Sequence, residues 1–198
     1  MSKVSTFGKI KIVMCFPLVI PHIIYYLTSN KKTIINEDIE AWRRLRGGSQ
    51  KNLFFLVRFL VLNKSFRTQF CYRLGSSACH VLHVFLKIDI PDFLEFNDHI
   101  GGGLVFVHTY GLGISGYAKI GKNCTMHQMS TIGFGKGGVP TIGDNVFIGM
   151  GAYVLGKVKV GNNVKIGAGA IVVDDVPDNC TVVGPKAQII NRKVISWF

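Results

Sequence analysis

The chain has 198 residues, a length that suggests one compact domain with extensions rather than two full domains. Hydrophobic residues make up 48% of the chain, which is enough to form a core. Its 23 Lys and Arg against 11 Asp and Glu give a net charge of +12, which favours anionic partners such as phosphates, acidic saccharides or a lipid surface. No recognition-helix or RNA-binding signature is present, so we expect no nucleic-acid partner. The 5 cysteines are irregularly spaced without a CxxC motif, which is typical of reduced cysteines in a cytoplasmic protein.

Residues 1–88 are expected to form an α-helical, partly apolar N-terminal region. The apolar run 12–27 follows Lys3, Lys9 and Lys11, as in a signal peptide, but no clear small-residue cleavage site comes after it. The run carries two prolines and is shorter than the ~20 residues that cross a bilayer. We therefore expect a helix that packs on the body of the protein or on other subunits. Peripheral membrane contact is the alternative, and it would place the protein at the inner face of the membrane.

Two further helical stretches follow. Residues 33–46 have acidic side chains early and basic side chains late, as the helix dipole favours, and a Gly-Gly pair ends them. Residues 51–88 are mainly apolar with helical spacing and a break at 63–65. His80 and His83 lie on one helical face of this stretch. No third metal ligand is near them in the sequence, so we interpret them as ordinary helix residues.

From residue 89 to 190 the pattern changes to a period of six, which fits neither a helix nor a strand. Such a period is typical of a parallel β-helix, in which each inward aliphatic residue stacks on the one eighteen residues later. The predicted fold class is therefore a left-handed parallel β-helix of the hexapeptide-repeat type, preceded by a short helical region and followed by a tail at 191–198. The aliphatic positions that carry the period are Ile142, Ile148, Val154, Val160, Ile166 and Val172.

The register of the period breaks twice. Phe106 and Ile114 are eight residues apart, which places two inserted residues around 109–113. Ile132 and Ile142 are ten apart, which places four in the glycine-rich segment 133–141. Insertions in a solenoid project at its corners and commonly carry function. We expect Lys136 in the second insertion to offer a positive charge to a ligand.

His108 lies immediately before the first break, and an imidazole beside a projecting loop is a candidate general base. His127 is expected nearby, one coil later, and His99 would complete a set of three metal ligands. Side chains alternate in direction along a strand, however, so His108 and His127 are predicted to diverge. A metal site is the less favoured alternative.

The segments VHTYGLGISGYAKIGKNCTMHQMSTIGFGKGG and VVGPKA together resemble the bacterial serine acetyltransferases and the related O-acetyltransferases of exopolysaccharide. The resemblance covers roughly residues 70–190. It implies an acyltransferase with acetyl-CoA as co-substrate and no metal. It also implies a homotrimer whose active sites lie between adjacent solenoids. Transfer goes to a hydroxyl, either of L-serine in cysteine biosynthesis or of a sugar in polysaccharide biosynthesis.

The resemblance also assigns roles to residues. The matching general base is His108, and the carboxylate that orients it in the family falls near Asp92, our first choice, or Glu95, our second. The residues matching the coenzyme-binding positions of the family are Gly133, Phe134, Gly135, Lys136, Met150, Gly151, Ala168 and Lys186.

The acceptor side departs from the family pattern. Serine acetyltransferases carry an Arg-His pair before a proline just after the glycine loop, and here Val139 precedes Pro140 instead. This difference favours a glycan hydroxyl at least as strongly as L-serine. Two other functions stay open: a metal-dependent enzyme of the γ-carbonic-anhydrase type, and a non-catalytic trimeric scaffold.

Overall fold

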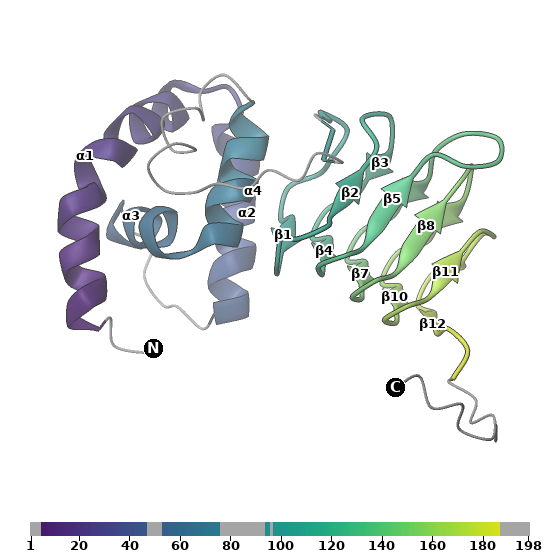
Figure 1. Cartoon of the computed structure of the whole chain (residues 1–198). Helices are drawn as coiled ribbons and strands as arrows, with labels where there is room; N and C mark the ends of the chain where they lie inside the picture. The colour runs from purple at the N-terminus through teal and green to yellow at the C-terminus, as the bar shows by residue number, and fades with distance from the viewer. Residues whose placement is uncertain (1–4, 47–52, 76–93, 96, 187–198) are drawn as a thin grey trace, which may run out of the picture.

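The computed structural model describes residues 5–46, 53–75, 94–95 and 97–186, and it contains a helical region followed by a parallel β-solenoid (Figure 1). This architecture confirms the predicted fold class. The predicted boundary between residues 88 and 89, the predicted tail, and His80, His83 and Asp92 lie outside the described residues.

The described part of the helical region consists of α1 (Thr6–Thr28), α2 (Lys32–Arg46), α3 (Leu53–Leu62) and α4 (Lys64–Leu74). The predicted break at 63–65 is the start of α4, where the Asn63 side chain accepts a hydrogen bond from Phe66 N. This N-cap satisfies a backbone donor that the helix leaves unpaired. Trp42, Phe59 and Phe66 pack edge to face between the helices and form an aromatic core.

The solenoid consists of three parallel sheets that the chain visits in turn, with strands of two or three residues. Its strands are β1 (Val105–Phe106), β2 (Gly113–Ile114), β3 (Lys119–Ile120), β4 (Thr125–Met126), β5 (Thr131–Gly133), β6 (Thr141–Ile142), β7 (Phe147–Ile148), β8 (Tyr153–Leu155), β9 (Lys159–Val160), β10 (Lys165–Ile166), β11 (Ile171–Val172) and β12 (Thr181–Val182). The five-stranded sheet has the order β1-β4-β7-β10-β12, the four-stranded sheet β11-β8-β5-β2, and the three-stranded sheet β3-β6-β9.

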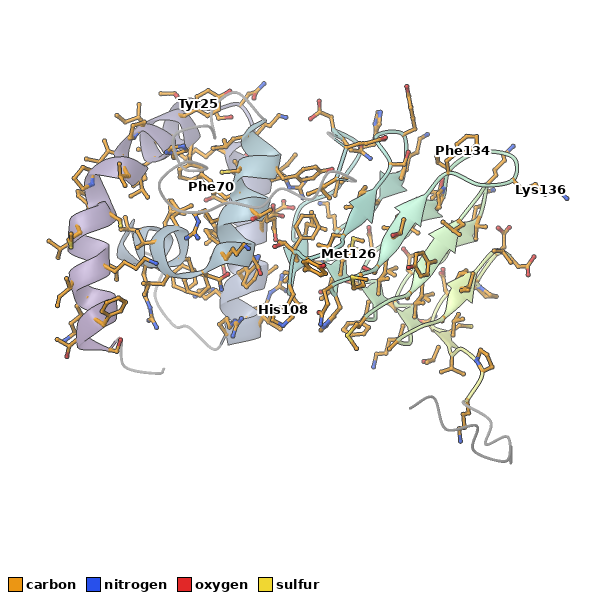
Figure 2. All side chains as sticks on the ribbon, viewed as in Figure 1. Tyr25, Phe70, His108, Met126, Phe134 and Lys136 are labelled. Atoms are coloured by element: carbon orange, nitrogen blue, oxygen red, sulfur yellow. The ribbon has the colours of Figure 1, made fainter. Side chains whose placement is uncertain are left out.

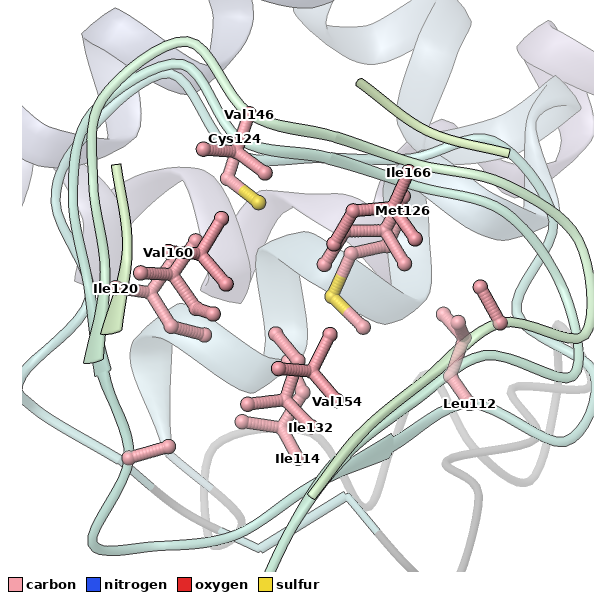
Figure 3. Close-up of a cluster of buried hydrophobic side chains, with 14 of the residues drawn as sticks. Leu112, Ile114, Ile120, Cys124, Met126, Ile132, Val146, Val154, Val160 and Ile166 are labelled. Atoms are coloured by element: carbon pink, nitrogen blue, oxygen red, sulfur yellow. The ribbon is translucent and has the colours of Figure 1, made fainter. Parts of the chain in front are cut away.

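A stack of aliphatic side chains lines the inside of each sheet, as the six-residue period predicts. Ile142 pairs with Val160 and Ile148 with Ile166, eighteen residues later in both cases. All four side chains are at most 3% exposed. Figure 3 shows the stacks, with side chains of successive coils lying on one another. Burying such a side chain contributes about 1.5–3 kcal/mol, so these stacks hold the coils together.

The pairing distance along the chain differs from eighteen where a coil is longer or shorter. Phe106 pairs with Met126 twenty residues later, and Met126 pairs with Ile148 twenty-two residues later. These two values reflect the two predicted insertions. Val160 pairs with Val176 sixteen residues later, a contraction that the period did not predict.

Helix α4 covers the N-terminal end of the solenoid, where the first coil would otherwise expose an unpaired strand edge. The Tyr72 ring packs against Phe106 with the ring centroids 5.9 Å apart. The Gln69 amide donates to Leu104 O at 2.6 Å and accepts from Phe106 N at 3.1 Å. Trp42 Nε1 donates to the same amide oxygen of Gln69 at 2.8 Å. Side chains of the helices thus take the place of a preceding coil.

A buried ion pair joins α2, α4 and the first coil. Arg73 donates to Asp38 Oδ2 at 2.8 Å and to the carbonyls of Ile100 and Gly101 at 2.8 and 2.6 Å. Asp38 Oδ1 accepts from Leu104 N at 2.9 Å. Burial raises the pKa of the Asp38 carboxyl above its ordinary value, and the guanidinium of Arg73 opposes that rise. Each of the two buried charges is therefore stabilised by the other.

Candidate functional site

Three kinds of corner join the sheets and recur from coil to coil. The histidine corner leads from the five-stranded to the four-stranded sheet and comprises residues 107–112, 127–130, 149–152 and 167–170. The loop corner leads from the four-stranded to the three-stranded sheet and comprises residues 115–118, 134–140, 156–158 and 173–175. The asparagine corner is built on a side-chain ladder whose members adopt φ of 56–62°: Asn123, Asn145, Asn163 and Asn179.

His108 lies in the first coil of the histidine corner, within the insertion itself. The residue before it donates its N–H to Met126 O, and the ladder resumes where Met129 N donates to Tyr110 O. His108 and Thr109 therefore have no counterparts in the next coil. The prediction placed the two inserted residues around 109–113, and the backbone ladder identifies them as His108 and Thr109. Because the insertion takes His108 out of the regular strand, its side chain is exposed (Figure 2).

His127 occupies the same corner one coil later. Its ring contacts Phe147 with the centroids 5.1 Å apart. Burial lowers the pKa of His127 below its ordinary value, and repulsion by His108 lowers it further. The alternation rule predicts that the two side chains diverge, but the insertion takes His108 out of the alternating strand positions. Both histidines lie at the histidine corner, where their charges influence each other.

Gln128 and Met129 follow His127 at this corner and have unusual environments. The Oε1 atom of Gln128 is shielded from solvent and has no hydrogen-bond partner in the described part of the chain. Its Nε2 atom lies 3.2 Å from Met150 Sδ. Met129 adopts φ of +62°, a left-handed conformation that costs a side-chain-bearing residue on the order of 1–3 kcal/mol and recurs at functional sites. Buried polar atoms are normally paired, so the Gln128 oxygen is suited to accept a hydrogen bond from a ligand.

The histidine corner continues through later coils as a track of small residues. A side chain built on Gly151 or Gly169 would meet nothing within 4 Å. Gly151 N donates to Gln128 O and Gly169 N donates to Met150 O, which keeps the coils aligned. The predicted coenzyme-binding residues Met150, Gly151 and Ala168 therefore lie at the same corner as His108.

The track ends near Lys186. Gly184 packs against Gly169, because a Cβ at Gly184 would lie 3.2 Å from Gly169 O. Lys186 follows two residues later and is exposed. Neighbouring strands lie about 4.8 Å apart, so the four steps from His108 to Gly184 cover about 19 Å. This is the length scale of an extended pantetheine arm.

The second insertion forms a hairpin at the loop corner. Gly135 and Gly138 form two hydrogen bonds with each other, of 3.0 and 3.2 Å, and Lys136 lies at the exposed tip. A Cβ at Gly135 would lie 2.7 Å from Gly156 N, so the hairpin requires glycine where it packs against the next coil. The predicted residues Gly133, Phe134, Gly135 and Lys136 are thus on the other side of the four-stranded sheet from the histidine corner (Figure 2).

Glu95 directly follows Leu94, which pairs with Ile114 in line with the four-stranded sheet. Its carboxylate accepts a hydrogen bond from Gly116 N at 2.5 Å, and its carbonyl accepts one from Tyr72 Oη at 3.0 Å. Within the described residues no hydrogen bond joins Glu95 to His108. Asp92, the first choice for a carboxylate partner, lies outside the described residues.

The metal alternative required His99, His108 and His127 to converge. His99 precedes Ile100, which pairs with Ile120 of the three-stranded sheet, whereas the other two histidines lie at the histidine corner. The described ranges contain no group of three His, Cys, Asp or Glu side chains arranged to hold a metal ion. The three histidines are therefore not brought together.

Comparisons with known proteins agree with this arrangement. Residues 140–174 match the family described as bacterial transferase hexapeptide (six repeats). The chain is 35% identical over 150 residues to the serine acetyltransferase of Helicobacter pylori, which covers 67% of this chain and 85% of that relative. It is 42% identical over 98 residues to the serine acetyltransferase of Synechococcus elongatus, covering 47% of this chain but spanning only 40% of that relative.

Solved structures of serine acetyltransferases are also similar to this chain. The serine acetyltransferase of Neisseria gonorrhoeae in complex with serine has a TM-score of 0.63 at 26% identity, covering 85% of this chain and 73% of that chain. A serine acetyltransferase in complex with CoA has a TM-score of 0.59 at 26% identity, covering 83% and 72%. The solenoid therefore matches the left-handed β-helix of these structures. The fold, the match to Helicobacter pylori and the motifs around His108 agree: the chain belongs to the serine acetyltransferase family.

Proposed function

We propose that this protein transfers the acetyl group of acetyl-CoA to a hydroxyl group, with His108 as the general base. The observation that carries this proposal is the insertion of His108 and Thr109. It displays an imidazole at the start of a track that is open above Gly151 and Gly169. The names of the relatives support the reaction class, and the CoA complex of one neighbour supports the co-substrate.

The chemistry fits an imidazole in this position. His108 accepts the proton of the hydroxyl while the hydroxyl oxygen attacks the carbonyl carbon of the thioester. The carbon–sulfur bond then breaks, and the leaving thiolate receives the proton from His108. The products are an O-acetyl ester and the free thiol of CoA. A positioned base of this kind contributes about 10²–10⁴ to the rate.

His127 assists by staying neutral. Burial and the neighbouring His108 both lower its pKa, so at neutral pH it adds no positive charge beside the base. A cation at that place would disfavour the imidazolium that forms on His108 during the reaction. The low pKa of His127 therefore supports proton uptake by His108.

In this proposal acetyl-CoA lies along the histidine corner, with its thioester at His108 and its pantetheine arm beside Met150, Gly151 and Ala168. Gln128 Oε1 would accept a hydrogen bond from the bound ligand, since no residue in the described ranges satisfies it. The exposed ammonium of Lys186 lies beyond the end of the track, where it suits a phosphate group.

A trimer would bring the two halves of the predicted coenzyme site together. The hairpin with Phe134 and Lys136 and the histidine corner flank the four-stranded sheet of one chain. Tyr153 and Ile171 of this sheet are 38% and 65% exposed, and Val173 at the adjoining loop corner is 58% exposed. A contiguous apolar surface of this kind favours contact with another subunit. We propose that one subunit supplies the hairpin and its neighbour the histidine corner, and a mass measurement in solution tests the trimer.

L-serine is the first acceptor to test, because the relatives are serine acetyltransferases. A sugar hydroxyl is the second, and one observation favours it. Between Gly133 and Pro140 the only charged side chain is Lys136, and it lies at the hairpin tip, so no Arg-His pair is available there for an amino-acid carboxylate. A sugar acceptor does not need such a cation.

A thiol-release assay tests the function. Purified protein is given acetyl-CoA and, separately, L-serine or neutral and acidic sugars of the cell envelope. We expect acceptor-dependent release of the CoA thiol, and the best acceptor decides between the two classes. The absence of release with every acceptor, together with the absence of CoA binding by calorimetry, would favour the trimeric scaffold.

The carboxylate partner of His108 needs its own test. Asp92→Asn and Glu95→Gln are compared in the same assay, at saturating acetyl-CoA. The residue that orients the imidazole will lower kcat when changed and will leave the coenzyme KM nearly unchanged. If neither change lowers kcat, His108 works without a carboxylate from this segment.

A further inference from the structure

Helix α1 packs against the protein along one face and leaves the opposite face uncovered. Its buried face includes Ile12, Val19, Ile23 and Tyr26, each at most 8% exposed. The outer face of α1 is apolar, with every member between 39% and 77% exposed: Phe7, Ile10, Val13, Met14, Phe16, Ile20, Ile24, Tyr25 and Leu27. Figure 1 shows α1 at the end of the molecule remote from the solenoid. A continuous apolar surface of this size marks a site of interaction.

The charges around α1 identify the kind of partner. Residues 1–36 contain five lysines and no Asp or Glu. Lys9 and Lys11 are exposed in the first turns of α1, and α1 itself carries no acidic residue. A helix with an apolar face and lysines is suited to a bilayer surface with anionic headgroups, where each lysine contributes about 1 kcal/mol.

Two features indicate that α1 lies along such a surface instead of crossing it. Among the described residues α1 is the one helix long and apolar enough to cross a membrane by length and composition. Its buried face, however, is engaged with α3 and the neighbouring helices. Pro17 and Pro21 lie inside the helix and donate no backbone hydrogen bond, which leaves the carbonyls of Val13 and Pro17 without helical donors. In a spanning helix such carbonyls need partners from other protein groups or ordered waters, whereas at the interface water satisfies them.

We propose that the outer face of α1 docks this protein on an anionic lipid bilayer, with the helix axis in the plane of the interface. The apolar side chains enter the boundary between headgroups and acyl chains, while Lys9 and Lys11 contact the phosphates. This inference does not depend on the acetyltransfer reaction. It places the site near acceptors that are carried on or assembled at a membrane.

Vesicle sedimentation with the full chain tests the proposal. One set of vesicles contains phosphatidylcholine and phosphatidylglycerol, and the other contains phosphatidylcholine alone. We expect binding to the anionic vesicles to be at least about tenfold tighter than to the neutral ones, and to weaken with salt. The double variant Val13→Gln/Ile24→Gln should bind the anionic vesicles at least about tenfold more weakly, because two anchoring side chains are lost.

Leu45→Gln is the matched control, because Leu45 is also half-exposed and apolar but lies on α2. This variant should bind as the unchanged protein does, and circular dichroism should show all variants folded. The proposal is overturned if the unchanged protein binds neither vesicle, or if the double variant binds as well as the unchanged protein. If, without lipid, the double variant has a lower mass in solution than the unchanged protein, the outer face of α1 binds a second copy of the chain and the proposal is overturned. Bound protein that does not transfer to fresh vesicles would indicate a crossing helix instead.

Discussion

The helical region and the solenoid bury their apolar residues in different ways. In the solenoid the same kind of aliphatic side chain recurs at the same place in successive coils, as in the stack of Ile148 and Ile166. In the helical region an irregular aromatic cluster around Trp42 and Phe66 fills the core. The six-residue period of the sequence predicts each residue of the stacked aliphatic core. It contains no information on the aromatic core of the helical region.

The two regions also differ in how they use polar groups. At the junction between them, the side chains of Asp38, Gln69 and Arg73 are buried and fully engaged with the backbone of the first coil. At the histidine corner, the Oε1 atom of Gln128 has no hydrogen-bond partner among the described residues, and the His108 side chain is exposed. Satisfied polar groups join the regions, and unsatisfied ones are available to a ligand.

The largest expected effect is on activity at the histidine corner. His108→Ala should lower kcat by about 10²–10⁴-fold and leave the melting temperature nearly unchanged, because the side chain is exposed and is the proposed general base. Thiol release measures the rate. His99→Ala is the matched control, since His99 is also exposed but lies away from this corner, and it should retain full activity. Equal activity of the two variants would show that His108 is not the general base.

The junction should be the most sensitive place for stability. Asp38→Asn should lower the free energy of unfolding by about 3–5 kcal/mol, because it leaves the Arg73 guanidinium buried without its counter-charge. Urea unfolding measures the change. Asp98→Asn removes the exposed ion pair with Lys31 and should cost at most about 1 kcal/mol. Similar losses for both would mean that the junction does not depend on the buried pair.

The stacked core of the solenoid comes next. Ile148→Ala should lower the free energy of unfolding by about 2–5 kcal/mol, because the side chain is fully buried between Met126 and Ile166 and its removal leaves a cavity. Ile10→Ala, on the outer face of α1, should change it by less than about 0.5 kcal/mol in the absence of lipid. A tolerated Ile148→Ala would contradict the role of the stacks.

A smaller effect is expected at the hairpin tip. Lys136→Gln should raise the KM for acetyl-CoA by about 3–10-fold with kcat unchanged, because it removes the proposed charge-assisted contact to the coenzyme. Steady-state kinetics separates the two constants. Lys119→Gln removes an exposed charge from β3 and should leave both constants unchanged. An unchanged KM for Lys136→Gln would exclude the hairpin from the coenzyme site.

The smallest effect is a pH dependence. The folded protein lowers the pKa of His127, so the unfolded chain binds more protons below the ordinary value of about 6.5. The stability from the neutral ring is complete above that pH and is lost as the pH falls from there toward the folded pKa. His127→Gln should therefore lose less stability between about pH 7.5 and pH 5.5 than the unchanged protein, measured by urea unfolding. Identical pH profiles would contradict the shift.

The sequence predicted the solenoid because its signal is repeated. One inward aliphatic position is weak evidence, but six in register define which face of each strand is buried. The prediction of α2 relied on acidic residues early and basic residues late in the segment. The structure places the helix at Lys32–Arg46, with basic residues in its last turn but no acidic residue in its first turn. The short last coil, with its pairing of Val160 and Val176, went unpredicted because the Asp-Asp-Val-Pro segment interrupts the period there.

The candidate site was harder to predict. The period located the first insertion only to within a few residues, and the backbone ladder was needed to identify it as His108 and Thr109. The junction residues Asp38, Gln69 and Arg73 lie in helices with many other polar and charged side chains, so the sequence does not single them out. Their partners are backbone atoms of a distant coil, which composition and spacing do not reveal. The division of the predicted coenzyme-binding residues between two corners likewise depends on how the coils close.

A crystal structure of the protein with bound CoA would show whether the histidine corner holds the coenzyme. We expect the sulfur atom beside the His108 ring and the pantetheine arm along the histidine corner past Met150 and Ala168. A CoA molecule bound along the asparagine corner, or a sulfur atom remote from His108, would contradict it.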